Sequence, residues 1–212
     1  MSYFFPEGAK FQFSTTFAAA KTVTAASNAN PTVLSSVAHG FVDGEEFLFL
    51  SGWEDASNSI FQADQLTADT LSALGLDTTN TQFYSAGTGT GTIQKVSNWT
   101  DIPQVLSISN SGGDPRYTDV QPLSARNGIK IPTGFNASTI TLSLGHDPQN
   151  ATYKAMLNIA RTQQKVALRI VGGGATVYGY GYMSVSEVPQ MQSGQVNQVQ
   201  CAISLLGRVI SY

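Results

Sequence analysis

The sequence predicts a mainly β protein with antiparallel sheets, one α-helix at residues 148–162 and a small inserted β domain. Apolar and polar residues alternate along much of the chain, and a single stretch has helical periodicity. Residues 21–95 differ from the rest in charge and texture. We therefore expect one larger β domain, made of residues 1–20 and 96–212, that is interrupted by a smaller one at 21–95.

The expected strands of the larger domain follow an alternation with a period of two. It is clearest in residues 138–144, 165–170, 176–185 and 197–205. Successive side chains of a strand point to opposite faces, so each of these stretches has one apolar and one polar face. This pattern is typical of antiparallel sheets with one face in the core and the other in solvent.

One helix is expected between these strands. Asp147 followed by Pro148 is a typical helix start, with an N-cap residue and then a proline at the first helical position. The apolar residues that follow have the i, i+3, i+4, i+7 spacing of one helix face. They are Tyr153, Met156, Leu157 and Ala160. We predict a helix over 148–162 that flanks the sheet formed by its neighbours.

The stretch 21–95 has the character of a separate module. It carries two basic and eight acidic side chains, whereas residues 96–212 carry eight basic and five acidic ones. Its strands are short, its turns are frequent, and a Gly-Thr repeat at 87–92 lies near its end. We interpret it as a small β module whose two ends lie close together, as insertion into another domain requires.

Residues 109–136 form a long polar connection between two expected strands. Structureless connections of this length are uncommon in compact domains and are usually functional or disordered. Charged and aromatic residues in the segment suit a contact with another subunit or ring. These residues are Asp114, Arg116, Tyr117, Asp119, Arg126 and Lys130. A mobile surface loop is the alternative.

Three tyrosines share one face of the expected strand 176–185: Tyr178, Tyr180 and Tyr182. Such a row can stack nucleic-acid bases. Because no basic groove lies beside it in the sequence, we expect a packed face or an inter-subunit face.

The composition favours a protein that is buried against copies of itself. Only 12% of the residues are charged, about half the usual fraction. Interface cores are depleted in charge, so this surface suits repeated self-association. The net charge of −3 argues against a protein that binds nucleic acid by neutralising phosphates.

Signals for catalysis and for membrane insertion are missing from the sequence. The two histidines, His39 and His146, accompany no nucleophile motif and no metal-type His/Cys cluster. We therefore expect no catalytic residue, no cofactor and no metal, and no apolar run is long enough for a membrane span. The single Cys201 excludes an internal disulfide. The first residues lack a signal-peptide pattern, so we expect a cytoplasmic site of synthesis.

The order of these features resembles the tail tube proteins of siphophages, including that of phage lambda. The resemblance covers residues 1–20 and roughly 96–212. Its parts are, in order, Gln104-Val-Leu-Ser-Ile, Tyr117-Thr-Asp-Val-Gln-Pro-Leu, Gly134-Phe-Asn-Ala-Ser-Thr-Ile-Thr-Leu-Ser-Leu, an Asp-Pro helix, the Lys-Val-Ala-Leu-Arg-Ile strand, the Tyr-Gly-Tyr-Gly-Tyr strand and Gln200-Cys-Ala-Ile-Ser-Leu-Leu-Gly-Arg-Val. The window 22–95 looks like a small β module common in phage tail and fibre proteins. Its position departs from the lambda protein, whose extra domain lies at the C-terminus.

The resemblance implies an antiparallel β-sandwich or half-barrel that assembles into hexameric rings. The rings would stack into a tail tube, the conduit for DNA ejection, and closing the sheet between subunits would remove exposed strand edges. The implied partners are other copies of the chain, the tape measure protein, the tail tip and terminator proteins, and phage DNA that passes through the lumen without sequence-specific binding. The implied location is the virion tail, assembled in the cytoplasm of the bacterial host. We expect a neutral or acidic lumen and the module 21–95 on the outer surface.

Two other functions remain open. An inner tube protein of a contractile tail or a secretion system would have the same architecture. A capsid-decoration or adhesin module would instead use the acidic stretch 21–95 as its active part. An enzyme is a distant third.

Overall fold

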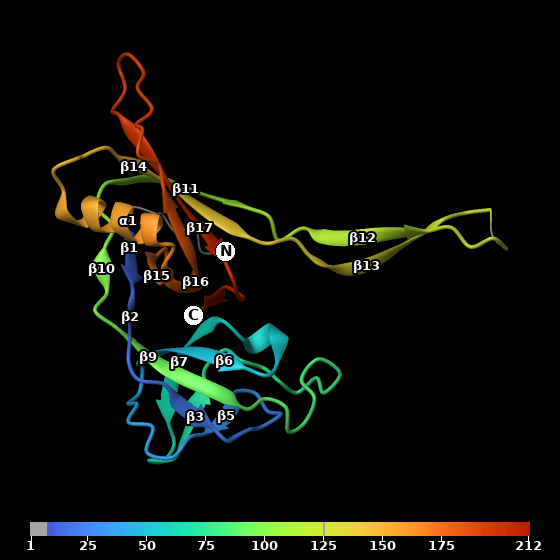
Figure 1. Cartoon of the computed structure of the whole chain (residues 1–212). Helices are drawn as coiled ribbons and strands as arrows, with labels where there is room; N and C mark the ends of the chain where they lie inside the picture. Colours follow the sequence, from blue (N-terminus) through green and yellow to red (C-terminus); the bar gives the residue numbers. More distant parts are fainter. Residues whose placement is uncertain (1–7, 125) are drawn as a thin grey trace.

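The structure, a computed structural model, describes residues 8–124 and 126–212. The expected domain segment 1–20 therefore lies partly outside the described residues. Two large sheets, one projecting two-stranded ribbon and one α-helix make up the fold, and every strand pairing is antiparallel (Figure 1). The predicted fold class is confirmed.

Sheet 1 contains eight strands in the order β10-β1-β15-β16-β17-β14-β11, with β18 also paired to β16. The strands are β1 (Lys10–Ser14), β10 (Thr100–Asp101), β11 (Val105–Ser111), β14 (Thr139–Gly145), β15 (Lys165–Gly172), β16 (Ala175–Val185), β17 (Gln198–Leu205) and β18 (Ile210–Ser211). Buried and more exposed residues alternate along β14 and β17, as the period of two predicts.

The core of sheet 1 lies under the helix α1 (Ala151–Thr162). Met156 of α1 joins one buried cluster with Phe13 of β1 and Leu142 of β14. Since β1 and β14 lie near opposite ends of the strand order, a single shared core requires the sheet to curve around it. Figure 1 shows α1 lying across these strands.

The helix begins three residues later than predicted. Its N-cap is Asn150, whose side-chain oxygen accepts hydrogen bonds from the N–H groups of Thr152 (2.8 Å) and Tyr153 (3.2 Å). Asp147 instead accepts the N–H of Gln149 (3.0 Å) and forms a turn before the helix. Both residues are good caps, and the sequence pattern did not distinguish them. The predicted end at residue 162 agrees with the structure.

Glycines explain the Tyr-Gly-Tyr-Gly-Tyr pattern of β16. A Cβ atom on Gly181 would lie 2.0 Å from the backbone oxygen of Ser204 in β17, so no larger residue fits there. The tyrosines occupy the opposite face of β16, where there is room for rings.

Sheet 2 also has eight strands, in the order β2-β9-β6-β7-β8-β5-β4, with β3 paired to β9. They are β2 (Thr16–Phe17), β3 (Lys21–Val23), β4 (Ala25–Ala26), β5 (Thr32–Ser35), β6 (Glu46–Ser51), β7 (Ser59–Gln65), β8 (Thr70–Ala73) and β9 (Gly91–Ser97), with a 3-10 turn, η1 (Glu54–Ala56). The sheet has its own core, which includes Phe47, Phe61 and Trp53.

The chain enters and leaves sheet 2 at one place. Thr16 of β2 is paired with Ser97 of β9, and Phe17 with Val96. All strands of sheet 2 therefore lie within residues 16–97, a few residues wider at each end than the expected module 21–95.

The segment 109–136, expected to be irregular, is instead mostly regular. Strand β11 continues to Ser111, and β12 (Pro115–Val120) and β13 (Ile129–Phe135) then form a two-stranded ribbon that projects from the body (Figure 1). The expectation rested on the length and polarity of the segment. Pro115 and Pro132 cannot donate to a ladder. Both strands of a two-stranded ribbon are edge strands, so the missing donors cost little.

Candidate functional site

The ribbon β12–β13 exposes apolar side chains on both of its faces. Residues paired across the ribbon share a face, and Val120 is paired with Ile129 and Thr118 with Ile131. Ile129 and Ile131 are 52% and 44% exposed. We call the face of Val120, Ile129 and Ile131 the aliphatic face.

The opposite face of the ribbon is aromatic and proline-rich. Tyr117 is paired with Pro132, and Pro115 with Phe135, on either side of a bulge in β13. Tyr117 is 56% and Phe135 72% exposed. We call the face of these four residues the aromatic face. The extensive contacts of β12 and β13 are with each other, so the chain itself covers neither face.

The six residues predicted to contact another subunit all lie on the ribbon or at its base. Arg116, Tyr117 and Asp119 are in β12 and Lys130 is in β13, while Asp114 precedes β12. Arg126 lies in the connection between the two strands. All six are exposed. Asp119 is paired with Lys130 across the ribbon, so these two charges face each other within one chain.

The apolar residues of the ribbon were missed by the sequence reasoning. The signal was present, because Ile129 and Ile131 alternate with Lys130 as in a strand. The polar and charged residues of the segment concealed this alternation.

A second surface covers the face of sheet 1 that points away from its core. Over β11, β14, β17 and the end of β16, the described residues of this face carry no charge. They are Ser107, Ser109, Ser111, Thr139, Thr141, Ser143, Gln198, Gln200, Ala202, Ser204, Tyr182 and Ser184. All are half-buried or exposed. We call this surface the charge-free face.

Hydroxyl and amide groups of the charge-free face bind one another. The hydroxyl of Ser143 donates to the side-chain oxygen of Gln198 (2.9 Å), and the hydroxyl of Ser184 donates to the carbonyl of Ala202 (3.2 Å). The outer edge of this region is open, because β11 pairs only with β14 among the described strands. Open strand edges are ready to pair with another chain.

The tyrosine row runs from a buried contact to the charge-free face. Tyr178 and Tyr180 are buried with Ala167 of β15 against Leu48 and Ile60 of sheet 2. Tyr182, at the other end, is 41% exposed, with the ammonium of Lys165 5.7 Å from its ring centre. The chain itself thus fills most of the face that was expected to pack or to meet another subunit.

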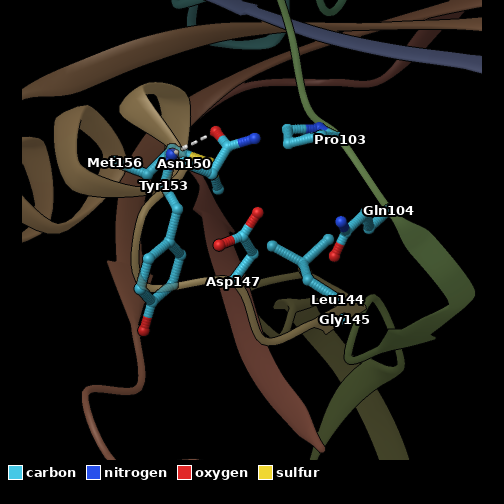
Figure 2. Close-up of a pocket in the computed structure, with 8 residues that line it drawn as sticks. All are labelled: Pro103, Gln104, Leu144, Gly145, Asp147, Asn150, Tyr153 and Met156. Atoms are coloured by element: carbon cyan, nitrogen blue, oxygen red, sulfur yellow. Dashed lines mark hydrogen bonds between the residues drawn. The ribbon is translucent and has the colours of Figure 1, made fainter. Parts of the chain in front are cut away.

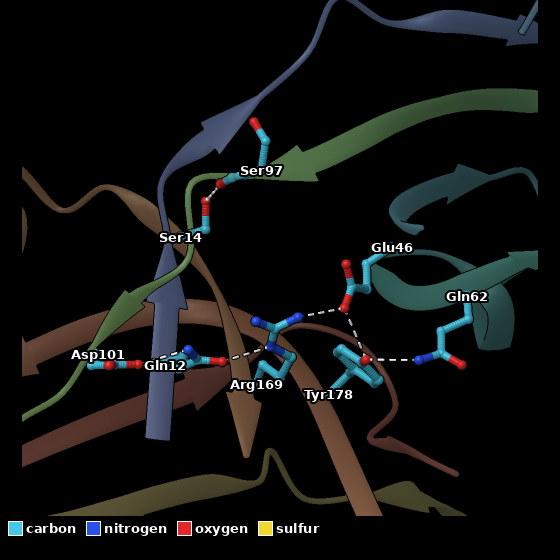
Figure 3. Close-up of polar contacts among 8 residues, drawn as sticks. All are labelled: Gln12, Ser14, Glu46, Gln62, Ser97, Asp101, Arg169 and Tyr178. Carbon is cyan, nitrogen blue, oxygen red and sulfur yellow. Dashed lines mark hydrogen bonds and ion pairs between the residues drawn. The ribbon is translucent and has the colours of Figure 1, made fainter. Parts of the chain in front are cut away.

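Polar groups also bind the two sheets together (Figure 3). Arg169 of β15 donates to the Glu46 carboxylate (2.6 Å) and to the side-chain oxygen of Gln12 (2.8 Å). The Tyr178 hydroxyl donates to the same Glu46 oxygen (3.1 Å) and accepts from Gln62 (2.9 Å). Burial, and then the negative charge of Glu46, raises the pKa of Tyr178 to about 12. The phenol therefore stays protonated and can keep donating.

Two hollows of the described surface differ in size and lining. The cavity between Pro103, Asp147 and Tyr153 in Figure 2 measures about 10 Å³, room for a single water. A larger, open hollow of about 430 Å³ is lined by Asp55, Asp77 and other residues of sheet 2 together with Arg208 and Ile210.

The histidine and cysteine side chains are buried, hydrogen-bonded or packed against other side chains of the fold. His39 is buried, with Nδ1 accepting the N–H of Phe41 (3.0 Å) and Nε2 2.9 Å from the carbonyl oxygen of Thr67. His146 packs edge-on against the ring of Tyr153. Burial raises the pKa of the Cys201 thiol to about 12, which suppresses the reactive thiolate. Among the described residues, no group of His, Cys, Asp and Glu could hold a metal ion, and no helix could span a membrane.

Comparisons with known proteins point to one family. Residues 51–212, more than half of the chain, match the family described as "Phage tail tube protein, TTP". A comparison with curated proteins finds no match. Among solved structures, a chain described as "Virion of native gene transfer agent (GTA) particle" aligns with 12% identity and a TM-score of 0.40, covering 54% of this chain and 88% of that chain.

Proposed function

The chain belongs to the phage tail tube protein family and is a structural component of the virion tail, and on this premise we propose that it forms hexameric rings that stack into the tube. The observation that carries the proposal is the ribbon β12–β13, whose apolar residues are exposed in the single chain. An isolated two-stranded hairpin is marginally stable in water, so such a ribbon suits burial against a partner. The open edge of β11 supports the same conclusion, since sheet closure between subunits removes it.

Other copies of the chain are the main partners in this proposal. The tape measure, tail tip and terminator proteins are its further partners in the virion, and assembly takes place in the cytoplasm of the bacterial host. The role is structural and involves no catalytic residue and no cofactor.

In this tube the charge-free face lines the lumen, with Lys165 of β15 at its border beside Tyr182. DNA must pass along it during ejection, and lysine or arginine there would bind phosphates and release counterions. Hydroxyl and amide side chains that already bind one another, such as Ser143 and Gln198, offer DNA neither strong attraction nor repulsion. DNA therefore passes along this face without sequence-specific binding.

Residues 16–97 form an inserted module on the outside of the tube. Sheet 2 packs against β15 and the first half of β16, beside the charge-free face and not over it. A bulky module on the outer wall leaves the lumen open.

Electron microscopy of purified protein at high concentration tests the proposal. We expect rings and tubes, and virions whose tails contain the chain. A monodisperse monomer at every concentration, together with tails that lack the chain, would overturn it. A sheath around the tube would indicate a contractile tail.

Arg116→Glu is the cleaner of two charge reversals on the ribbon. Arg116 is paired with Gly134, so its reversal changes the charge offered to a partner without creating a like-charged pair. Asp119→Lys would place two lysines opposite each other, because Asp119 is paired with Lys130. We expect Arg116→Glu to impair tube formation while the circular dichroism spectrum stays unchanged. Normal tubes from this variant would remove Arg116 from the contact.

The lumen assignment has its own matched pair of variants. Gln200→Lys should slow DNA ejection from assembled phage, whereas Gln200→Glu should leave it near normal, because only the cation attracts phosphates. Equal ejection kinetics for both variants would place Gln200 outside the lumen.

A further inference from the structure

The ribbon is apolar on two sides, and the two sides differ in chemistry. Ile129 and Ile131 lie on the aliphatic face, and Tyr117 and Phe135 lie on the aromatic face. A ribbon that lies on a single surface needs only one apolar face, as an ordinary half-buried strand does. Two apolar faces therefore indicate burial on both sides.

We propose that each ribbon lies between two other copies of the chain, with its aliphatic face on one copy and its aromatic face on the other. The inference rests on the proposed tube, which contains two kinds of contact: between neighbours within a ring and between stacked rings. Head-to-tail contacts of these two kinds use different surface patches, which fits two faces of different chemistry.

Copies of this chain are the partner favoured by the structure. The ribbon continues directly from β11 and β14, the strands next to the open edge of sheet 1, so it extends a surface that already lacks a partner. Asp119 and Lys130 lie opposite each other on the aromatic face, and Arg116 lies on the aliphatic face. The ribbon thus offers few charges to a partner, which matches a chain with only 12% charged residues.

The size of the ribbon also favours two contacts. Strand β13 has seven residues, which span roughly 23 Å at 3.3 Å per residue. One face of a two-stranded ribbon of that length offers well under the roughly 800 Å² per partner of a standard interface. Covering both faces doubles the buried apolar area, and repetition around each ring adds many such contacts.

Paired variants separate the two faces. Ile129→Thr with Ile131→Thr removes apolar groups from the aliphatic face, and Tyr117→Thr with Phe135→Thr removes them from the aromatic face. Threonine is β-branched, a feature that strands favour, so each variant suits the strand conformation. Thr118→Ser, on the same ribbon, is the control. Sedimentation velocity and micrographs would measure the populations of subunits, rings and tubes.

Each double variant should raise the protein concentration needed for tubes at least about tenfold, and the two should stop at different stages. One should accumulate unassembled subunits and the other single rings, while Thr118→Ser assembles normally. Arrest of both at the same stage, or normal assembly by either, would overturn the inference. A wild-type chain that forms neither rings nor tubes would instead count against the proposed tube itself.

A labelling experiment avoids dependence on disruptive variants. Thr118→Cys reports on the aliphatic face and Lys130→Cys on the aromatic face, because each residue shares that face through the ribbon pairing. The native Cys201 is buried and contributes no background. Both introduced thiols should react with a maleimide in subunits and be protected in tubes. Protection of only one of them would show a ribbon with one partner and overturn the inference.

Discussion

Two regions of the molecule contain similar aromatic residues but differ in exposure to solvent. One is the contact between sheet 1 and sheet 2, and the other is the ribbon β12–β13. Tyr178 in the contact is 1% exposed, and its hydroxyl is bonded to Glu46 and Gln62. Tyr117 on the ribbon is 56% exposed. Exposed apolar surface of this kind is unfavourable in water and is normally covered by other groups. The contact between the sheets is completed by the chain itself, whereas the apolar faces of the ribbon are exposed in the single chain.

The largest expected difference is between two tyrosines of one strand. Tyr178→Ala should lower the free energy of unfolding by about 3–5 kcal/mol, because it empties a buried aromatic site between the sheets. Tyr182 lies further along the same strand and is 41% exposed. Tyr182→Ala should therefore lower the free energy of unfolding by less than about 1 kcal/mol. Chemical denaturation of unassembled subunits measures both. Equal losses would mean that the contact between the sheets contributes little.

Two ion pairs give a smaller contrast. Glu46→Gln weakens the hydrogen bonds from Arg169 and Tyr178 in a site where the pair is mostly shielded from solvent. It should lower the free energy of unfolding by about 1–3 kcal/mol. Glu187→Gln breaks the exposed pair with Arg161 and should leave stability unchanged within error. A larger loss for Glu187→Gln than for Glu46→Gln would contradict this assignment.

Alkaline pH should weaken the same contact. Burial raises the pKa of Tyr178 and of Tyr212 to about 12, above the usual value near 10 of the unfolded chain. The unfolded state then loses these protons first, so stability should be fully present below pH 10 and fall as the pH rises toward 12. Tyr178→Phe should reduce the slope of this loss. An unchanged slope in a pH series of denaturation curves would assign the loss to other groups.

The smallest effect on stability is expected on the ribbon. Ile131→Thr should change the free energy of unfolding of the isolated subunit by less than about 0.5 kcal/mol, because Ile131 contacts solvent there. The same substitution at the fully buried Ile203 should cost about 2–4 kcal/mol, since it replaces an ethyl group in the core with a hydroxyl. A large loss at Ile131 would mean that the ribbon is already packed in the single chain.

Deleting the segment 22–95 would not be a clean test of its role. The deletion would uncover Tyr178 and Tyr180 and leave Arg169 without Glu46. A failure to assemble could then follow from the uncovered apolar surface. Replacing the contact residues one at a time, as with Glu46→Gln, keeps the effects separate.

Regular elements with strong periodicity could be predicted from the sequence. The alternation in β14 and β17 and the spacing of Tyr153 and Met156 correctly predicted two strands and the helix. The helix start was wrong because two good caps, Asp147 and Asn150, lie three residues apart, and only their hydrogen bonds distinguish them.

Pairing between distant segments could not be predicted. The sequence around Arg169 gives no indication that Glu46 lies beside it, since the two residues are 123 positions apart. The charge-free face escaped notice for the same reason. Each strand contributes only two to four of its uncharged residues, and the surface emerges when the registers of four strands bring them together. On the ribbon, the length and polarity of the segment concealed a hairpin. Its two prolines cost little there, because both strands are edge strands.

The paired strands β2 and β9 have an evolutionary consequence. Thr16 and Ser97 are neighbours across that pairing, so the two ends of the intervening segment meet at one place. Recombination could therefore exchange the segment as a unit, provided that this one junction is kept. An incoming segment must supply a carboxylate for Arg169 and an apolar patch for Tyr178 and Tyr180. Selection would then hold those few positions, while the far side of sheet 2 diverges from one lineage to the next.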